Sequence, residues 1–207
     1  MKFIHPNIIF LDTNLDLSAQ YLTNKHLDNC IKSCNDVLLS SLFYMIGIRS
    51  KKFHTFYFSG DKRKESMDKW FPTYPLKSGP AFIKYNSQEA RWCRKCKNHY
   101  DYILRYFESL LNEYAYRFHN DHKLYEMLDF FKMIMYEISV KYGIRVVYIK
   151  DLKITLPWKS LPVRYRKKNI IEGYRAYYVH QVFDPIGDYM GSSRNVPEFF
   201  KLDNDIA

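Results

Sequence analysis

The stretch from about Gln88 to Phe118 repeats apolar residues every three or four positions, and this pattern constrains the fold more than any other. Such spacing lines up apolar side chains on one face of an α-helix, whereas a half-buried strand alternates. The apolar stripe consists of Trp92, Cys96, Ile103, Phe107, Leu110 and Tyr114. Basic residues lie off the stripe, so the sequence predicts a long amphipathic helix with a positive flank.

Three further helices are predicted: two from the same spacing, over about residues 27–45 and 122–142, and one over about residues 170–183, before Pro185. Gly47 and Gly143 follow the first two, as glycine commonly does at a helix C-terminus. A short β-branched run at residues 145–149 predicts one strand, and the first twelve residues predict a short extended segment. The fold class expected is therefore mainly α, as one compact helical domain over residues 1–207.

Residues 48–85 differ from the rest of the chain. The sequence FHTFYF alternates like a strand, and charged residues, proline and glycine are concentrated after it. This composition predicts a short β-containing basic insertion or exposed basic loop on the common fold. A long loop in a compact domain is usually functional or mobile, although its basic run is more often a solvated face.

The charge balance points to a polyanionic partner. Lys and Arg number 32 against 22 Asp and Glu, which leaves a formal charge of +10 and a pI near 9.3. A basic chain is often simply soluble, but 19 Tyr and 15 Phe also lie among these cations. Aromatic and basic side chains together form the surface that stacks on unpaired bases and contacts phosphates. Nucleic acid, and DNA in particular, is the partner expected.

Targeting and cysteine patterns indicate an intracellular protein. No run of 18 apolar residues occurs, and the N-terminus becomes polar too soon for a signal peptide. We therefore expect no membrane contact and a cytoplasmic location. The pairs Cys30/Cys34 and Cys93/Cys96 could together form a four-thiolate zinc site. Buried free thiols explain them better, so neither a metal nor a cofactor is predicted.

Three clusters could carry chemistry, and the first surrounds Lys25 and His26 at the start of the first long helix. Asn24, Asp28 and Asn29 lie beside them. Because Asn and Asp satisfy the free amides of a first helical turn, an ordinary helix start explains this cluster as well as a site does.

The second cluster, EYAYRFHNDHK, contains Glu113, Arg117, His122 and Lys123. Glu113 and Arg117 are four positions apart, so an ion pair on one helix face is the ordinary explanation. The functional alternative is a phosphate clamp with a proton-transfer histidine beside it.

The third cluster joins YRKKN to GYRAYY. It supplies Tyr165, Arg166, Lys167, Lys168, Tyr174, Arg175, Tyr177 and Tyr178. So many tyrosines and cations on and before one short helix exceed what a core requires. Phosphate contacts from the basic residues and base stacking on the tyrosines would explain them.

These motifs, in chain order, resemble a known group of proteins. The order NIIFLD, NKH, WCR, EYAYR with HK, YRAYY and VPEFF resembles small bacteriophage proteins related to the pyrimidine-dimer DNA glycosylases of the endonuclease V type. The likeness spans nearly the whole chain except residues 48–85. It implies a compact helical domain that grips duplex DNA and flips out a damaged or modified base.

The resemblance also implies which residues form the site. His26 matches a histidine of the motif, while Ser33 stands at the position of the assisting glutamate. The catalytic residues expected are His26, His122 and Glu113. The DNA-binding residues expected are Lys25, Arg94, Arg117, Lys123, Tyr165, Arg166, Tyr174, Arg175 and Tyr178.

Several functional interpretations remain open. One is a viral enzyme acting on DNA bases with displaced reactive groups, either a glycosylase-like enzyme of DNA repair or a base-modifying transferase in thymine hypermodification. Another is a non-catalytic DNA-binding protein that kept the grip and lost the glutamate at Ser33. The third is a protein-binding viral effector whose basic charge is incidental.

Overall fold

The computed structural model describes residues 8–45, 87–141, 156–182, 189 and 194–200. The predicted insertion at residues 48–85, the predicted strand at residues 145–149, and Gly47 and Gly143 lie outside the described residues. The predictions made for them therefore stay predictions.

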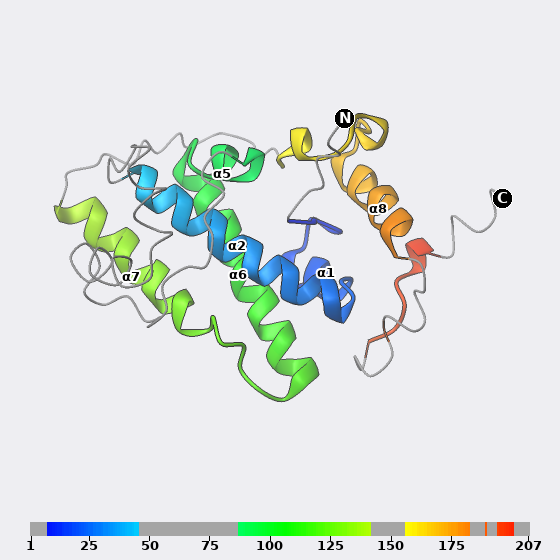
Figure 1. The fold of residues 1–207 in the computed structure, drawn as a ribbon, viewed down its shortest axis with the longest axis horizontal. Coiled ribbons are helices and arrows are strands. Elements are labelled where there is room, and N and C mark those ends of the chain that lie inside the picture. Colours follow the sequence, from blue (N-terminus) through cyan, green and yellow to red (C-terminus); the bar gives the residue numbers. More distant parts are fainter. Residues whose placement is uncertain (1–7, 46–86, 142–155, 183–188, 190–193, 201–207) are drawn as a thin grey trace, which may run out of the picture. The chain divides into compact units, whose positions relative to one another are not determined.

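The chain is mainly α-helical, as predicted, and no strand occurs among the residues that the structure describes. The α-helices are α1 (Leu15–Gln20), α2 (Asn24–Met45), α5 (Gln88–Cys93), α6 (Lys97–Phe118), α7 (Glu126–Lys141) and α8 (Ile170–Gln181). The short 3-10 helices are η1 (Trp158–Ser160), η2 (Val163–Tyr165) and η3 (Glu198–Phe200). Figure 1 shows their order along the chain.

The prediction of one long helix over residues 88–118 is wrong at one point, because the helix is interrupted between α5 and α6. Trp92 stacks on His99 with ring centroids 4.0 Å apart, and the carbonyl of Trp92 lies 2.9 Å from His99 Nδ1. In a continuous helix, residues seven apart are separated by about 10 Å along the axis. The break at Arg94–Cys96 brings the two rings together, which apolar spacing alone does not reveal.

Helix α1 was missed by the sequence prediction. Its N-cap is Asn14, whose side chain accepts from the amides of Asp16 at 2.9 Å and Leu17 at 3.2 Å. Asp12 in turn accepts from the amide of Asn14 at 2.9 Å. The run Asp-Thr-Asn before a leucine is a typical N-terminal signal. It could have been found, but a helix of six residues is too short to show a period.

The chain forms two compact units. The first contains residues 1–33, 105–122 and 154–207, and the second contains residues 34–104 and 123–153. The long helices α2 and α6 each contribute residues to both units. The single domain over residues 1–207 stays a prediction.

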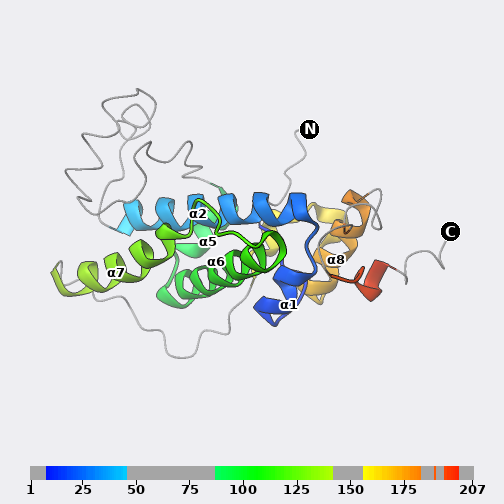
Figure 2. The same cartoon turned by 90° about the horizontal axis from the view of Figure 1, so that it is seen from below.

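The core of the first unit is aromatic. Phe10 packs on Tyr106 at a centroid distance of 5.0 Å and, edge-on, on Tyr174 at 5.6 Å. The Tyr106 hydroxyl donates to the carbonyl of Ile9 at 2.6 Å and accepts from Ser18 at 3.1 Å. Figures 1 and 2 show, from two sides, the C-terminal end of α6 beside the turn that joins α1 to α2. The first predicted cluster begins at that turn.

The second unit buries its apolar residues on α2, α6 and α7. The buried side chains include Leu38, Leu42, Ile103, Leu128 and Phe131. Ile103 belongs to the apolar stripe predicted above, and the other four recur at the same three-to-four spacing on their own helices. Periodicity therefore identified the buried faces of these helices.

Candidate functional site

The turn between α1 and α2 is held by Arg117 of α6. The Arg117 guanidinium donates to the carbonyls of Leu22 at 2.7 Å and Gln20 at 2.9 Å, and to the side chain of Asn24 at 3.1 Å. It also pairs with Glu113 at 2.7 Å. Arg117 is buried and engaged within the protein. This arrangement gives it a structural role, and its contact with phosphate stays a prediction.

Tyr178 of α8 fixes the same turn from another side. Its hydroxyl accepts from the amide of Thr23 at 2.7 Å, and its ring lies edge-on to His26 at 5.0 Å. Thr23 Oγ1 lies 2.8 Å from His26 Nδ1, so the imidazole is oriented by one side-chain oxygen and one ring. His26 is half-buried, which leaves part of its side chain open to solvent. The structure thus places His26 in a defined position at the start of α2.

Glu113 receives two guanidinium groups. Besides Arg117, it accepts from Arg194 Nε at 2.9 Å and Arg194 Nη2 at 2.7 Å. Arg194 also lies over the ring of Tyr116 at 4.1 Å. The ion pair expected from the spacing of Glu113 and Arg117 is confirmed. Arg194 was not anticipated, because it lies 81 residues from Glu113 and no local pattern links the two.

His122 lies in the loop that follows α6 and contacts the carboxylate of Asp28 on α2. Its Nε2 lies 3.2 Å from Asp28 Oδ1, and Asp28 also pairs with Lys32 one turn further along α2. Burial raises the pKa of Asp28, but the hydrogen bonds from Lys32 and His122 outweigh it and hold this pKa below its ordinary value of 3.8. The His122 ring lies edge-on to Tyr114 at 4.8 Å and is almost fully buried.

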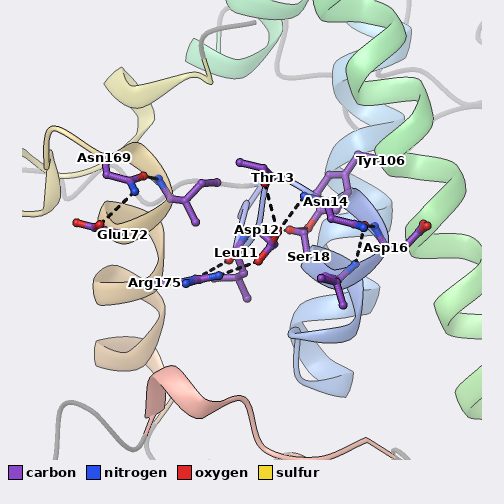
Figure 3. Close-up of polar contacts among 12 residues, drawn as sticks. Leu11, Asp12, Thr13, Asn14, Asp16, Ser18, Tyr106, Asn169, Glu172 and Arg175 are labelled. Carbon is purple, nitrogen blue, oxygen red and sulfur yellow. Dashed lines mark hydrogen bonds and ion pairs between the residues drawn. The ribbon is translucent and has the colours of Figure 1, made fainter.

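Arg175 ties α8 to the segment before α1. Its Nε donates to the carbonyl of Leu11 at 2.7 Å, and its Nη2 pairs with Asp12 at 2.8 Å (Figure 3). The guanidinium also lies 5.3 Å from the ring centroid of Phe199. These contacts hold Arg175 within the first unit. Its contact with DNA stays a prediction.

The sequence interpretation of the tyrosines on α8 was wrong. Tyr174, Tyr177 and Tyr178 are all buried, so the core does require them. The Tyr174 hydroxyl lies 2.9 Å from Ser160 Oγ, which is itself buried. Neither Tyr174 nor Tyr178 presents a face on which a base could stack in this conformation. The number of tyrosines on α8 was misleading, because Tyr178 packs against Thr23 and Tyr174 against Ser160, so α8 is covered by more than one segment.

The basic residues before α8 do lie on the surface. We call residues 159–168 the pre-α8 loop; Lys159, Arg164, Arg166, Lys167 and Lys168 in it are all exposed. Arg166 donates to the carbonyls of Leu161 at 2.9 Å and Lys159 at 3.1 Å, which closes the loop on itself. The half-buried ring of Tyr165 packs edge-on against Tyr177 at 5.4 Å. The loop is therefore anchored on α8 while its cations face solvent.

Gly173 allows the backbone of the pre-α8 loop to lie close to α8. A Cβ added to Gly173 would lie 2.4 Å from the carbonyl oxygen of Tyr165, which is a backbone atom. Within an α-helix, alanine is normally more favourable than glycine by about 1 kcal/mol. Here the clash reverses that preference, because neither backbone has room to withdraw without loosening the pre-α8 loop.

Gly173→Ala is expected to lower the free energy of unfolding by about 1–3 kcal/mol, despite the gain in helix propensity. Chemical denaturation checks this, with Ala176→Gly on the same helix as the comparison for propensity alone. Ala176→Gly should cost about 1 kcal/mol. A Gly173→Ala protein more stable than the parent would contradict the close packing of α8 on the loop.

Three other predicted DNA-binding residues are dispersed. Lys25 is exposed in the first unit, next to His26. Arg94 is half-buried, Lys123 is exposed, and both belong to the second unit. The structure therefore brings Lys25 near the His26 position, while nothing places Arg94 or Lys123 with it.

The four cysteines form no disulfide. Cys30, Cys34 and Cys93 are buried and Cys96 is half-buried. Burial raises the pKa of the Cys30 and Cys93 thiols to about 12, which keeps them protonated and unreactive at neutral pH. Within the described residues, no group of three or more metal-ligating side chains could hold an ion.

Comparisons with protein-family models, with curated proteins and with solved structures find no match for this chain. Its own residues are therefore the basis for assigning a function. None of the helices in the described part of the chain is long and apolar enough to cross a bilayer.

Proposed function

We propose that this chain is a viral DNA-acting protein that grips duplex DNA and engages an extruded or modified pyrimidine, as a base-excision or thymine-hypermodification enzyme. The observation that carries the DNA contact is the pre-α8 loop, whose cations are exposed on a loop anchored to α8. The histidine at the start of α2 supports the chemistry.

The charge of the pre-α8 loop favours an anionic partner. Residues 156–171 contain five Lys and Arg and no Asp or Glu, so the loop has no acidic residue of its own to neutralise it. The loop also leads directly into α8, whose N-terminus carries a partial positive charge. Cations at that end of a helix repel this charge; Glu172 in the first turn of α8 offsets part of the repulsion, and a bound phosphate would relieve the rest.

The shape of the loop favours a polymer over a single small anion. All five of its cations are exposed, so none of them lines a buried pocket. Phosphates repeated along a duplex match such a set of cations, since each exposed Lys or Arg can neutralise a different one. These contacts position the protein and carry no sequence information.

Replacing Arg164, Lys167 and Lys168 with glutamine is expected to weaken duplex binding and to reduce its salt dependence. Each lost phosphate contact lowers the slope of log K against log salt by about 0.9, so the slope should fall by up to about 3. Fluorescence anisotropy over a salt series measures both quantities. All three side chains are exposed, so the variant should remain folded.

The matched control replaces Arg91, Lys95 and Arg105, which are exposed cations outside the pre-α8 loop. This variant carries the same change in net charge and should keep most of the parent's affinity. Equal losses in both triple variants would assign binding to net charge alone. A parent protein that does not bind DNA at low salt would favour the protein-binding effector.

Among the residues predicted to be catalytic, His26 fits proton transfer best. It is half-buried and oriented by Thr23 and Tyr178, whereas His122 is almost fully buried. Glu113 is buried between two guanidinium groups, which favours a structural role. An imidazole can gain or lose a proton near neutral pH, which base excision and base modification both require.

A further inference from the structure

We infer that Val163 is a wedge that enters the base stack of a bound duplex, an inference that rests on the DNA binding proposed above. Val163 is 76% exposed, while the other exposed large hydrophobic side chains of the described residues are 37–49% exposed. It stands at the first position of η2, inside the pre-α8 loop. An apolar side chain so fully in water is stabilised by any partner that buries it.

The backbone holds Val163 outward. Pro162 precedes it in an extended conformation, the amide of Tyr165 donates to the Pro162 carbonyl at 2.9 Å, and the amide of Arg166 donates to the Val163 carbonyl at 3.1 Å. The carbonyl of Tyr165 rests against Gly173 of α8. Val163 is therefore mounted on a braced turn, which can push between bases without first being ordered.

The neighbours of Val163 favour nucleic acid as the partner. Arg164 follows it directly, with its guanidinium 4.7 Å from the ring centroid of Tyr165, and the exposed Lys167 and Lys168 follow in the same loop. A single apolar side chain among cations is too small for a protein interface, which needs a contiguous apolar core. Proteins that kink or open DNA combine these two features, an apolar wedge and flanking cations on the phosphates.

This geometry also implies a preferred substrate. Inserting a side chain into a base stack costs free energy, and the cost is least where a base is mismatched, damaged or already unpaired. A valine offers shape and apolar surface but no hydrogen bond, so it senses how easily a step opens and not which base is there. The favoured substrate class is therefore a duplex with one weakened pyrimidine step.

The test uses duplexes that carry 2-aminopurine beside a matched or a mismatched pyrimidine, since this base fluoresces more when it is unstacked. The parent protein should raise the fluorescence severalfold and bind the mismatched duplex more tightly. Val163→Ser should lose most of the rise and of the mismatch preference, while affinity for the matched duplex changes less than about threefold. Val163→Leu should keep both properties, because it remains an apolar wedge.

Three outcomes would overturn the inference, and they differ from one another. If the parent shows no salt-dependent binding, the proposed function fails and the wedge fails with it. If the parent binds but Val163→Ser and Val163→Leu behave alike, the wedge alone is wrong. If Val163→Ser weakens binding to matched and mismatched duplexes equally, Val163 is a general contact and not a wedge. Circular dichroism of each variant confirms that an exposed substitution leaves the fold intact.

Discussion

Arg117→Ala is expected to lower the free energy of unfolding by about 3–5 kcal/mol. The Arg117 guanidinium is buried and satisfies Glu113 together with the carbonyls of Gln20 and Leu22. Removing it leaves a buried carboxylate with one partner fewer and two carbonyls without their donor. Removing one partner of a buried ion pair costs much more free energy than replacing both partners with apolar residues. The reason is that the remaining charge stays buried without its counter-charge. Urea denaturation at neutral pH measures the loss.

Arg194→Ala is the matched control for this change. Arg194 binds the same carboxylate of Glu113 through two nitrogens, but its side chain is 26% exposed. Water can therefore replace part of what is lost, and the cost should be about 1 kcal/mol. If Arg194→Ala were as destabilising as Arg117→Ala, burial would not be the property that distinguishes them, and the structural role given to Arg117 would be wrong.

His26→Gln is expected to lower any turnover on DNA by about 10²–10⁴-fold while leaving duplex affinity nearly unchanged. Glutamine keeps a polar side chain of similar reach beside Thr23 but cannot transfer a proton near neutral pH. The measurement incubates the protein with duplexes that carry normal, dimerised or hydroxymethylated pyrimidines. Strand cleavage, base loss and a change in mass are followed together, so excision and modification are both detected.

The control for this variant is His119→Asn. His119 is exposed at the end of α6 with a positive φ of 51°, a conformation that asparagine tolerates. The His119→Asn substitution should leave both turnover and duplex affinity unchanged. Full activity in His26→Gln would remove the assigned proton-transfer group. Binding by the parent without turnover on any of these duplexes would identify a non-catalytic DNA-binding protein.

Apolar spacing was enough to predict α2, α7 and most of α6, and to identify buried faces on all three. Such periodicity is a local property, because side chains three and four positions apart share a helix face whatever surrounds them. The same reasoning failed at Arg94–Cys96, where a stack of Trp92 on His99 divides the helix. A separate argument, from the density of tyrosines and cations, failed on α8, where Tyr174 and Tyr178 were taken as surface and are core. Periodicity does not count how many sides of a helix are covered.

By itself, the sequence determined the helical class, the buried stripes and the Glu113–Arg117 pair, since each depends on residues close together in the chain. It also determined the basic composition, which is a sum over the whole chain. Only the tertiary structure decided which polar groups are available for function. Arg175 reaches Asp12 across 163 residues, and Tyr178 reaches Thr23 across 155. A side chain becomes buried or exposed through partners far away in sequence, and burial governs both the cost of its charge and its access to a ligand. That is why the tyrosines of α8 belong to the core, while Val163 and its neighbouring cations face solvent.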